Sequence, residues 1–245
     1  MIRLENLSLD IPIYTNETRQ LKRVILRTVT GGALKRESSR VTSIKALSKI
    51  NCTIKKGERV ALIGHNGSGK STFLKIISGI YLPTSGTIFK NIRVDPIIEK
   101  SFLTSVELSG LVAAKSYYLM RNGSTKGFDK YLQEVLDFSG LGEFIYLPIK
   151  TYSLGMVGRL IFTILTSFNY ECLALDEGFG AGDTEFTLKA AERTKEFIDN
   201  AGTLVFASHS IPLLKQFCER GLVFNKGTIV FDGPLIQALE YYEQN

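Results

Sequence analysis

Apolar and polar residues alternate along most of the chain with two distinct periods. Short runs rich in Val, Ile and Leu predict buried strands, and segments with apolar residues three or four positions apart predict amphipathic helices. The predicted strands are residues 2–11, 46–54, 59–64, 86–92, 172–176, 202–208, 220–227 and 228–233, and the predicted helices are residues 70–80, 183–199, 211–218 and 234–244. Strands that alternate with helices indicate an α/β fold with a mostly parallel core sheet flanked by helices.

Two segments interrupt this alternation. Residues from about 95 to 160 have mainly helical patterns, which predicts a lateral helical subdomain beside the sheet. Residues 18–29, TRQLKRVILRTV, place Leu21, Val24 and Ile25 on one helical face and basic side chains on the other, which predicts a short amphipathic helix. No internal repeat is present, and residues 1–245 are expected to form a single domain.

The composition is that of a folded globular protein, because 44% of the residues are hydrophobic and 22% are charged. The cysteines, Cys52, Cys172 and Cys218, are too far apart for a disulfide framework or a metal-binding spacing, which fits a reducing compartment. The N-terminal residues are charged from the third position, so no signal peptide is expected. Polar and charged residues interrupt the most apolar stretch, so no bilayer span is expected.

The net charge of +6 is concentrated in one segment. Residues 15–50 contain nine lysines and arginines but only two acidic residues, which accounts for the whole excess of positive charge. A basic run of this kind is typical of a solvated protein surface, of a contact with an anionic membrane and of a contact with nucleic acid. All three interpretations stay open for this segment.

A glycine-rich loop follows the predicted strand 59–64 and precedes the predicted helix 70–80. Its sequence, GHNGSGKST, fits the pattern G-x-x-x-x-G-K-[ST], in which successive backbone N–H groups hold phosphate oxygens. In this pattern Lys70 reaches the β- and γ-phosphates of a nucleotide, and the hydroxyl of Ser71 ligates Mg²⁺. The predicted phosphate-binding residues are Gly64, His65, Asn66, Gly67, Ser68, Gly69, Lys70, Ser71 and Thr72.

Polar residues also follow two other apolar strands. Asp176 and Glu177 end the run CLALDE, and we expect Asp176 to ligate Mg²⁺ and Glu177 to accept a proton from an attacking water. His209 follows the strand 202–208, at the edge where α/β sheets bind ligands. In isolation all three would be read as solvated residues at strand ends. Their position relative to a phosphate loop favours a place in its site.

With these motifs the chain resembles the ATP-binding cassette (ABC) ATPases over nearly its whole length. The loop is similar to their Walker A motif, and residues 172–176 are similar to Walker B. The family has a signature motif, usually LSGGQ, at the start of a helix shortly before Walker B. Residues 152–156, YSLGM, are in that place and retain Ser153 and Gly155, while Leu154 replaces a glycine.

Other features resemble one subgroup of these ATPases, the bacterial polysaccharide exporters for O-antigen, capsule and teichoic acid. The form Tyr-Ser-x-Gly-Met is similar to their signature, and ELSG at residues 107–110 is similar to an ELTG element. The segment GFGAGD, which ends in Asp183, resembles their D-loop, and the basic insertion at about 15–45 resembles theirs. We therefore expect the P-loop ABC ATPase fold, with a small N-terminal antiparallel β part.

The resemblance implies a site shared between two copies of the chain. Head-to-tail pairing would enclose two ATP molecules, with Ser153 and Gly155 of one copy against the γ-phosphate held by the other. Glu177 would be the catalytic base, and His209 would contact the γ-phosphate. ATP and Mg²⁺ are the implied cofactors.

Three further residues are assigned by the resemblance. Glu99 has the place of the glutamine that senses Mg²⁺, so it is expected near both metal and nucleotide, and Asp183 is expected at the nucleotide through the D-loop. Tyr14 is the best candidate for an aromatic side chain that stacks on adenine. Ordinary packing at the sheet edge is an equally good interpretation of Tyr14.

The resemblance also implies partners. An integral membrane subunit, in two copies, would carry the translocation path for a lipid-linked polysaccharide, and the chain would lie on the cytoplasmic face of the bacterial inner membrane. The apolar segment 102–114 would be either part of the docking groove or a plain core helix. No C-terminal carbohydrate-binding domain is expected. A transporter for a lipid, drug or ion is the first alternative, and an ATPase acting on nucleic acid is the second, although no nucleic acid is expected.

Overall fold

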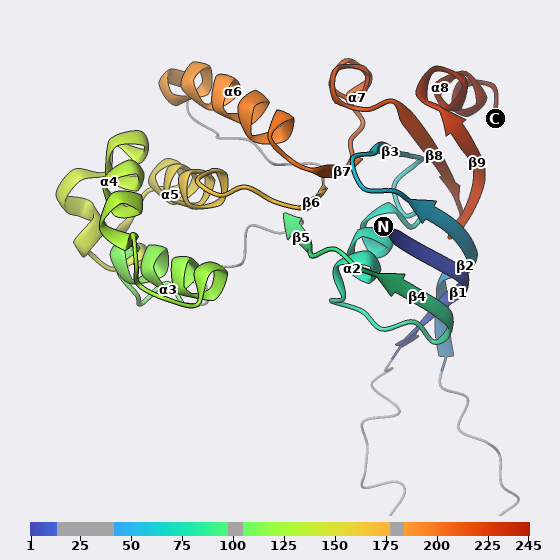
Figure 1. The fold of residues 1–245 in the computed structure, drawn as a ribbon, viewed down its shortest axis with the longest axis horizontal. Coiled ribbons are helices and arrows are strands. Elements are labelled where there is room, and N and C mark those ends of the chain that lie inside the picture. The colour runs from blue at the N-terminus through green and yellow to red at the C-terminus, as the bar shows by residue number, and fades with distance from the viewer. Residues whose placement is uncertain (14–41, 98–104, 177–183) are drawn as a thin grey trace, which may run out of the picture.

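Two β-sheets and a lateral group of helices make up the structure, a computed structural model that describes residues 1–13, 42–97, 105–176 and 184–245 (Figure 1). The first sheet is antiparallel, with strand order β2-β1-β4, and the second has the order β5-β6-β7-β3-β8-β9. Neighbouring strands of the second sheet are parallel except for β8 and β9, which form an antiparallel hairpin. The strands are β1 (Ile2–Ile13), β2 (Thr42–Ile54), β3 (Arg59–Ile63), β4 (Ser85–Lys90), β5 (Val94–Ile97), β6 (Cys172–Leu175), β7 (Thr203–Ala207), β8 (Arg220–Asn225) and β9 (Thr228–Pro234).

Helix α2 (Lys70–Ser78) lies between the two sheets. Its apolar residues Phe73 and Leu74 are buried in one core with residues of the antiparallel sheet and with alternate residues of the larger sheet, such as Val60. The helix ends at Ser78 and is capped by Gly79, whose φ of 82° is left-handed, so glycine is favoured there. Burial on both sides fixes the start of α2, which follows the glycine-rich loop.

On the opposite face of the larger sheet lie α7 (Ile211–Phe217), α8 (Leu235–Gln244) and the C-terminal end of α6 (Thr184–Asp199), whose N-terminal half packs on Phe138 and Phe162 instead. They pack against the strand residues that alternate with those of the first core, as Ala61 does on β3. The strands are therefore apolar on both faces, as a parallel sheet covered by helices requires. This arrangement confirms the predicted α/β class and the predicted antiparallel N-terminal part.

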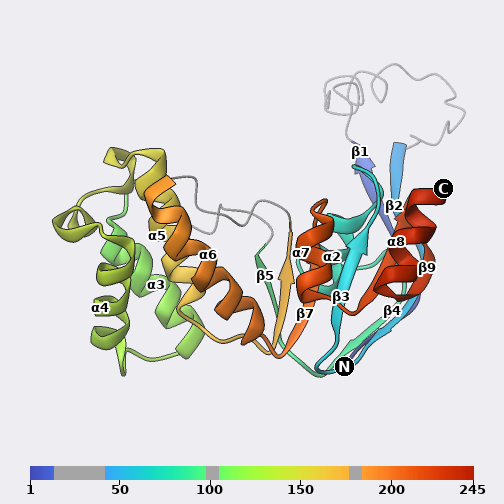
Figure 2. The same cartoon turned by 90° about the horizontal axis from the view of Figure 1, so that it is seen from above.

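A separate helical lobe lies beside the sheets in both views (Figures 1 and 2). It consists of α3 (Gly110–Asn122), α4 (Phe128–Ser139), α5 (Leu154–Thr166) and the 3₁₀ turns η2 (Gly142–Tyr146) and η3 (Ile149–Thr151). The lobe has its own core, in which the rings of Tyr118, Phe128 and Tyr131 contact one another. Helix α5 also buries Ile161 and Leu165 in the core on the larger sheet, so the lobe is packed against the sheet as well.

A buried carboxylate joins the lobe to the larger sheet. Asp95 on β5 is 8% exposed and accepts hydrogen bonds from Arg93, at 2.9 Å, and from Arg121 at the end of α3. The guanidinium of Arg121 also lies 4.4 Å from the ring centroid of Tyr170. Because a buried charge is costly without partners, this network ties α3 to the sheet edge more firmly than surface ion pairs would.

Strand β5 is the main difference from the sequence pattern, which placed the start of the helical region at about residue 95. Its sequence, VDPI, contains an acid and a proline, and neither is typical of a strand. β5 is an edge strand, so the missing N–H of Pro96 is tolerated, and the arginines neutralise Asp95. Strands β1 and β2 also run further than predicted, since Ile13 pairs with Thr42.

All three cysteines are buried and unpaired, in agreement with the prediction of no disulfide framework. Burial in an apolar environment raises the pKa of Cys52, Cys172 and Cys218 to about 12 in each case. The thiols therefore stay protonated at neutral pH and act as small apolar side chains.

The contact between β8 and α8 yields a stability prediction. A Cβ added to Gly221 would lie 2.4 Å from the Cβ of Ala238, so Gly221→Ala forces the helix away from the sheet. We expect a loss of about 1–3 kcal/mol in the free energy of unfolding, measured by denaturant titration. Gly158→Ala is the matched control, because its Cβ would meet no atom within 4 Å and alanine favours the helix. Equal stability of the two variants would contradict the packing.

Candidate functional site

Three motifs that are far apart in the sequence meet at one edge of the larger sheet. Strands β6, β7 and β3 are consecutive and parallel, so their carboxyl ends share an edge. The glycine-rich loop 64–72 follows β3, Asp176 follows β6 and His209 follows β7. The carboxyl edge of a parallel sheet is where α/β proteins bind ligands. The topology therefore places the predicted loop, acid and histidine on one site.

The loop has a conformation that depends on glycine. Gly64, Gly67 and Gly69 have φ values of 149°, 77° and 114°, in a region that other residues rarely adopt. At Gly64 there is also no space, because an added Cβ would lie 2.5 Å from the carbonyl oxygen of Phe224 and 2.7 Å from Oγ of Ser68. This close packing shapes the concavity above α2.

Lys70 is the first residue of α2, and its side chain is almost fully buried, at 8% exposure. Its ammonium donates to the carbonyl oxygens of Gly64, at 2.6 Å, and His65, at 3.1 Å. No side chain caps the helix and no acidic residue lies in its first turn. The start of α2 therefore presents helix N–H groups and a held lysine, a combination that attracts phosphate.

Two side chains of the loop are held by other elements. Oδ1 of Asn66 lies 3.0 Å from Nε2 of His209, in the connection after β7. Nδ1 of His65 lies 3.1 Å from the hydroxyl of Tyr242 on α8, and the two rings are 5.1 Å apart. The loop thus has a defined conformation that is set by side-chain contacts as well as by its glycines.

A cavity of about 600 Å³ lies over the loop. The predicted residues that line it are Asn66, Gly67, Gly69, Lys70, Ser71, Thr72, Asp176 and His209. The other predicted loop residues, Gly64, His65 and Ser68, do not line the cavity but pack within the loop and hold its shape. Tyr14, Glu99, Glu177 and Asp183 lie outside the described residues, as do the predicted helix 18–29 and residues 102–104 of the predicted docking segment.

The cavity contains oxygen donors suited to Mg²⁺. The hydroxyl of Ser71 and the carboxylate of Asp176 both line it, and Mg²⁺ prefers oxygen ligands. The described part of the chain contains no group of three or more His, Cys, Asp or Glu side chains that could hold a metal alone. A Mg²⁺ ion here would thus be completed by phosphate oxygens and water, which is its usual mode with nucleotides.

Sequence reasoning missed a second wall of the cavity. It is formed by β1, β2 and the β8–β9 turn and consists of Ile11, Ile44, Lys45, Ala46, Lys226 and Gly227. The residues NKGT (225–228) span the junction of the two predicted strands 220–227 and 228–233, but nothing local to them shows that a turn there reaches the loop 64–72. Ile11 and Ile44 are opposite each other in the β1–β2 ladder and are both partly exposed, at 37% and 57%.

The structure does not bring Ser153 and Gly155 to this cavity, because neither residue is part of its lining. Ser153 caps α5, and its Oγ accepts a hydrogen bond of 3.2 Å from the N–H of Met156. Leu154, next to it, is 93% exposed and points away from the protein. The predicted signature residues therefore form a helix start on the lobe, separate from the phosphate loop of the same chain.

Comparison with known proteins identifies the class. A model of the family described as "ABC transporter" matches residues 47–180, and this region contains the phosphate loop, the start of α5 and Asp176. The chain therefore belongs to the ABC transporter family, as an ATP-binding subunit that couples ATP hydrolysis to transport.

Two solved ABC proteins have the same fold. One, titled an ATP-binding subunit of an ABC transporter, has a TM-score of 0.69 at 20% identity, over 99% of this chain and 93% of that one. The other, a dimeric cassette with ADP and Pi, has a TM-score of 0.65 at 20% identity, over 96% and 99%.

Relatives with higher identity belong to export systems. The chain is 36% identical to the O-antigen export system ATP-binding protein RfbE of Yersinia enterocolitica, over 92% of this chain and 94% of RfbE. It is 31% identical to the teichoic acids export ATP-binding protein TagH of Staphylococcus haemolyticus, over 99% and 88%. It is 36% identical to the O-antigen export protein RfbB of Myxococcus xanthus, over 83% of this chain and 46% of RfbB. Among the described helices, none has the length and apolar character needed to cross a bilayer.

The packing of the loop predicts that substitution of Gly64 abolishes nucleotide binding, whereas substitution of a glycine in open space does not. Gly64→Ala introduces a Cβ into occupied space, so we expect nucleotide binding to fall below detection in calorimetric titrations with ATP. Gly57→Ala in the β2–β3 turn is the control, since Gly57 has a φ of 88° but open space around it. A positive φ costs about 1–3 kcal/mol in both variants, so the difference between them reports on the occupied space at Gly64. ATP binding that is unchanged in Gly64→Ala would show that the loop tolerates a side chain.

Proposed function

We propose that this chain is the ATP-hydrolysing subunit of an exporter that moves a lipid-linked polysaccharide, of O-antigen or capsule type, across the bacterial inner membrane. The observation that carries the ATPase function is the convergence of the loop, Asp176 and His209 on one cavity. Support for the substrate class comes from the relatives, which are export proteins for O-antigen and for teichoic acids, both of them polymers. The ATPase of an ABC transporter for another substrate, a lipid, drug or ion, is the alternative.

The proposed active site is completed by a second copy of the chain. Ser153 and Gly155 lie at the start of α5, outside the cavity of their own chain. In a head-to-tail pair, the N–H groups at this helix start would face the γ-phosphate held by the partner, and the helix dipole would favour that anion. The exposed Leu154 would then meet the partner instead of water. The dimeric cassette among the structural relatives is consistent with such a pair.

Within one chain, the proposed roles follow from position and chemistry. Lys70 and the loop N–H groups bind the β- and γ-phosphates, and Ser71 and Asp176 would hold Mg²⁺, which neutralises phosphate charge when it is bound. Glu177 follows Asp176 in sequence and is proposed as the base that takes a proton from water. Glu99 and Asp183 are retained as proposed contacts with metal and nucleotide, and Tyr14 as a proposed contact with adenine.

His209 gives the proposed site a response to nucleotide. Its Nε2 lies 3.0 Å from Asn66, so the ring rests against the loop that binds the phosphates. A γ-phosphate in the cavity would offer a charged acceptor to the same nitrogen, and charge-assisted hydrogen bonds are stronger than neutral ones. Exchange of Asn66 for phosphate would couple the connection after β7 to the bound nucleotide. Such a local contact change is typical of nucleotide-driven switches.

The chain is proposed to act at the cytoplasmic face of the membrane through an integral membrane subunit that carries the translocation path. No described helix spans a bilayer, and the family is one of transporters. The helical lobe, with its separate core, is the proposed part that responds to this partner. Nucleic acid is the second alternative, and a salt-dependent binding assay with duplex and single-stranded probes separates it from export.

The first test uses Glu177→Gln. We expect this variant to bind ATP and form the dimer but to hydrolyse ATP about 100-fold more slowly or worse, because the amide cannot accept a proton. In cells that lack the native chain, the wild type restores surface polysaccharide and the variant does not. Normal ATP turnover by the variant would refute the role of Glu177. ATP-dependent export of a different substrate by the wild type would refute the polysaccharide assignment alone.

A second test separates the structural role of Ser153 from its proposed contact with phosphate. Ser153→Ala removes the cap of α5, which costs about 1 kcal/mol, whereas Ser153→Asp keeps a good cap. We expect the melting temperature of Ser153→Asp to equal that of the wild type while its ATPase activity is lost, because the carboxylate repels the γ-phosphate. Wild-type activity in Ser153→Asp would reduce the residue to a helix cap.

A further inference from the structure

A strained lysine lies at the rim of the nucleotide cavity. Lys226 and Gly227 form the two-residue turn between β8 and β9, as the pairing of Asn225 with Thr228 shows. Lys226 has a φ of 45°, in the left-handed region that asparagine and glycine tolerate best. Turns of this type therefore prefer Asn-Gly, and a lysine in the first position carries a conformational cost. Lys49 on β2 has a similar φ of 48°, so strain alone does not assign a role to Lys226.

The turn is fixed against the phosphate loop by its backbone. The N–H of Gly227 donates to the carbonyl oxygen of Ser68 at 2.8 Å, and the carbonyl oxygen of Gly227 accepts from the N–H of Ser48 at 2.8 Å. A Cβ on Gly227 would lie 2.6 Å from the carbonyl oxygen of Ala46, so the contact with β2 is tight. None of these contacts uses the side chain of Lys226, an exposed residue that is among those lining the cavity.

The position of Lys226 within the cavity indicates which part of a nucleotide it meets. Lys70, Asp176 and His209 mark the end that takes the β- and γ-phosphates and the metal. Ile11 and Ile44 pair across β1 and β2, two residues along β2 from Ala46, and give the cavity an aliphatic end on which an uncharged base fits. The turn sits between these ends, because Gly227 contacts both Gly69 of the loop and Ala46 of β2.

We propose that Lys226 binds the α-phosphate of the nucleotide. An ammonium group supplies donors and charge but no acceptor, so the phosphate nearest the aliphatic end is the group that it suits best. Lys45 lines the same cavity and adds to its positive potential. This inference rests on the proposed nucleotide site and extends it, since the β8–β9 turn becomes part of substrate binding.

The α-phosphate is common to ATP and ADP, and it does not change during hydrolysis of the γ-phosphate. Lys226 therefore contributes equally to the binding of substrate and product. Its loss raises KM for ATP and leaves kcat unchanged, because uniform binding does not lower the barrier of the chemical step. Loss of a residue that contacts the γ-phosphate would instead weaken the binding of ATP and leave the binding of ADP unchanged.

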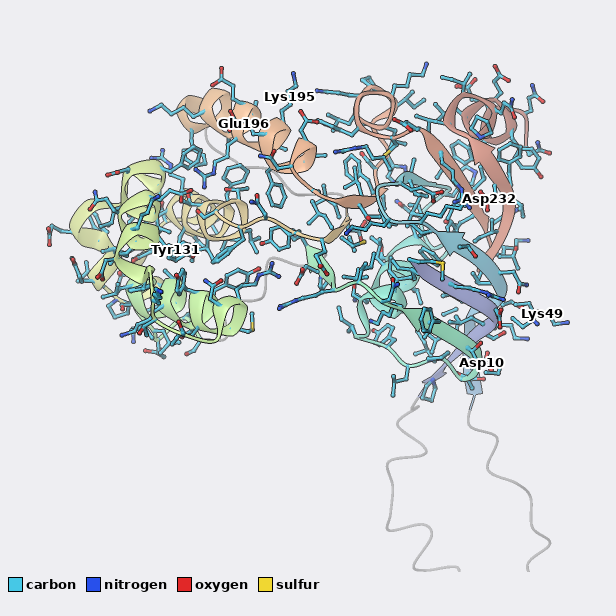
Figure 3. All side chains as sticks on the ribbon, viewed as in Figure 1. Asp10, Lys49, Tyr131, Lys195, Glu196 and Asp232 are labelled. Carbon is cyan, nitrogen blue, oxygen red and sulfur yellow. The ribbon has the colours of Figure 1, made fainter. Side chains whose placement is uncertain are left out.

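The experiment compares Lys226→Asn with Lys49→Asn. Lys49 on β2 has a φ of 48°, lies outside the nucleotide cavity and projects into solvent (Figure 3). Its replacement by asparagine therefore relieves the same backbone strain but removes no contact with a nucleotide. We expect both variants to melt at or above the wild-type temperature. Only Lys226→Asn should raise the Kd for ATP and for ADP, each by about threefold to tenfold, as expected for the loss of a charge-assisted contact. Lys226→Arg should retain wild-type affinity.

The outcomes are separable. If the wild type fails to bind ATP, the proposed nucleotide site is wrong. If the wild type binds ATP and Lys226→Asn binds ATP and ADP with wild-type affinity, the proposed role of Lys226 is wrong. If Lys226→Asn weakens the binding of ATP alone, the assignment to the α-phosphate is wrong. If Lys226→Asn does not fold, Lys226→Met and Lys226→Arg decide the point, because only the loss of charge should weaken ADP.

Discussion

The buried ammonium of Lys70 is the constraint on which the rest of the site depends. It lies at the start of α2, between two sheets, and its partners within the loop are the carbonyl oxygens of Gly64 and His65. These carbonyls point inward only if the loop turns through left-handed conformations, and therefore only if glycines are present at its bends. The fold holds a positive charge and a set of N–H groups in place before any anion arrives, so little rearrangement is needed on binding.

The division of the molecule into sheets and lobe has a functional counterpart. The phosphate loop, Asp176 and His209 belong to the sheets, and Ser153 belongs to the lobe. The lobe has a core of its own, but α5 also buries Ile161 and Leu165 in the core on the larger sheet, so the two halves of a proposed composite site are joined by apolar packing as well. The Asp95 network is one polar joint between them, and it combines a buried carboxylate with two arginines. Arg193 of α6 forms a second one, with Glu134 of α4 and Thr166 of α5.

Local sequence patterns predicted much of this arrangement. The alternation of apolar strands and helices predicts the class of fold, and the spacing of the glycines predicts the conformation of the phosphate loop. Asp176 and His209 were predicted because each follows an apolar strand, and parallel strands bring their carboxyl ends together. The structure confirms this convergence, while their chemical roles stay predictions.

What the sequence could not predict depends on contacts between distant segments. Strand β5 was missed because Asp95 and Pro96 are unfavourable locally, and only two arginines and an edge position make them acceptable. The wall formed by Ile11, Ile44 and the turn at Lys226 was missed for a similar reason. Each of those segments has an ordinary pattern, and none of them signals that it will face the phosphate loop.

The buried thiols have a practical consequence. Thiol reagents attack the thiolate, and Cys52, Cys172 and Cys218 have pKa values of about 12 and little exposure. The native protein therefore offers almost no reactive sulfur to a maleimide at neutral pH. A single cysteine placed on the helical lobe and another on the sheets would carry a pair of fluorophores without removal of the native ones. The distance between lobe and sheets then becomes a spectroscopic quantity in an otherwise unaltered chain.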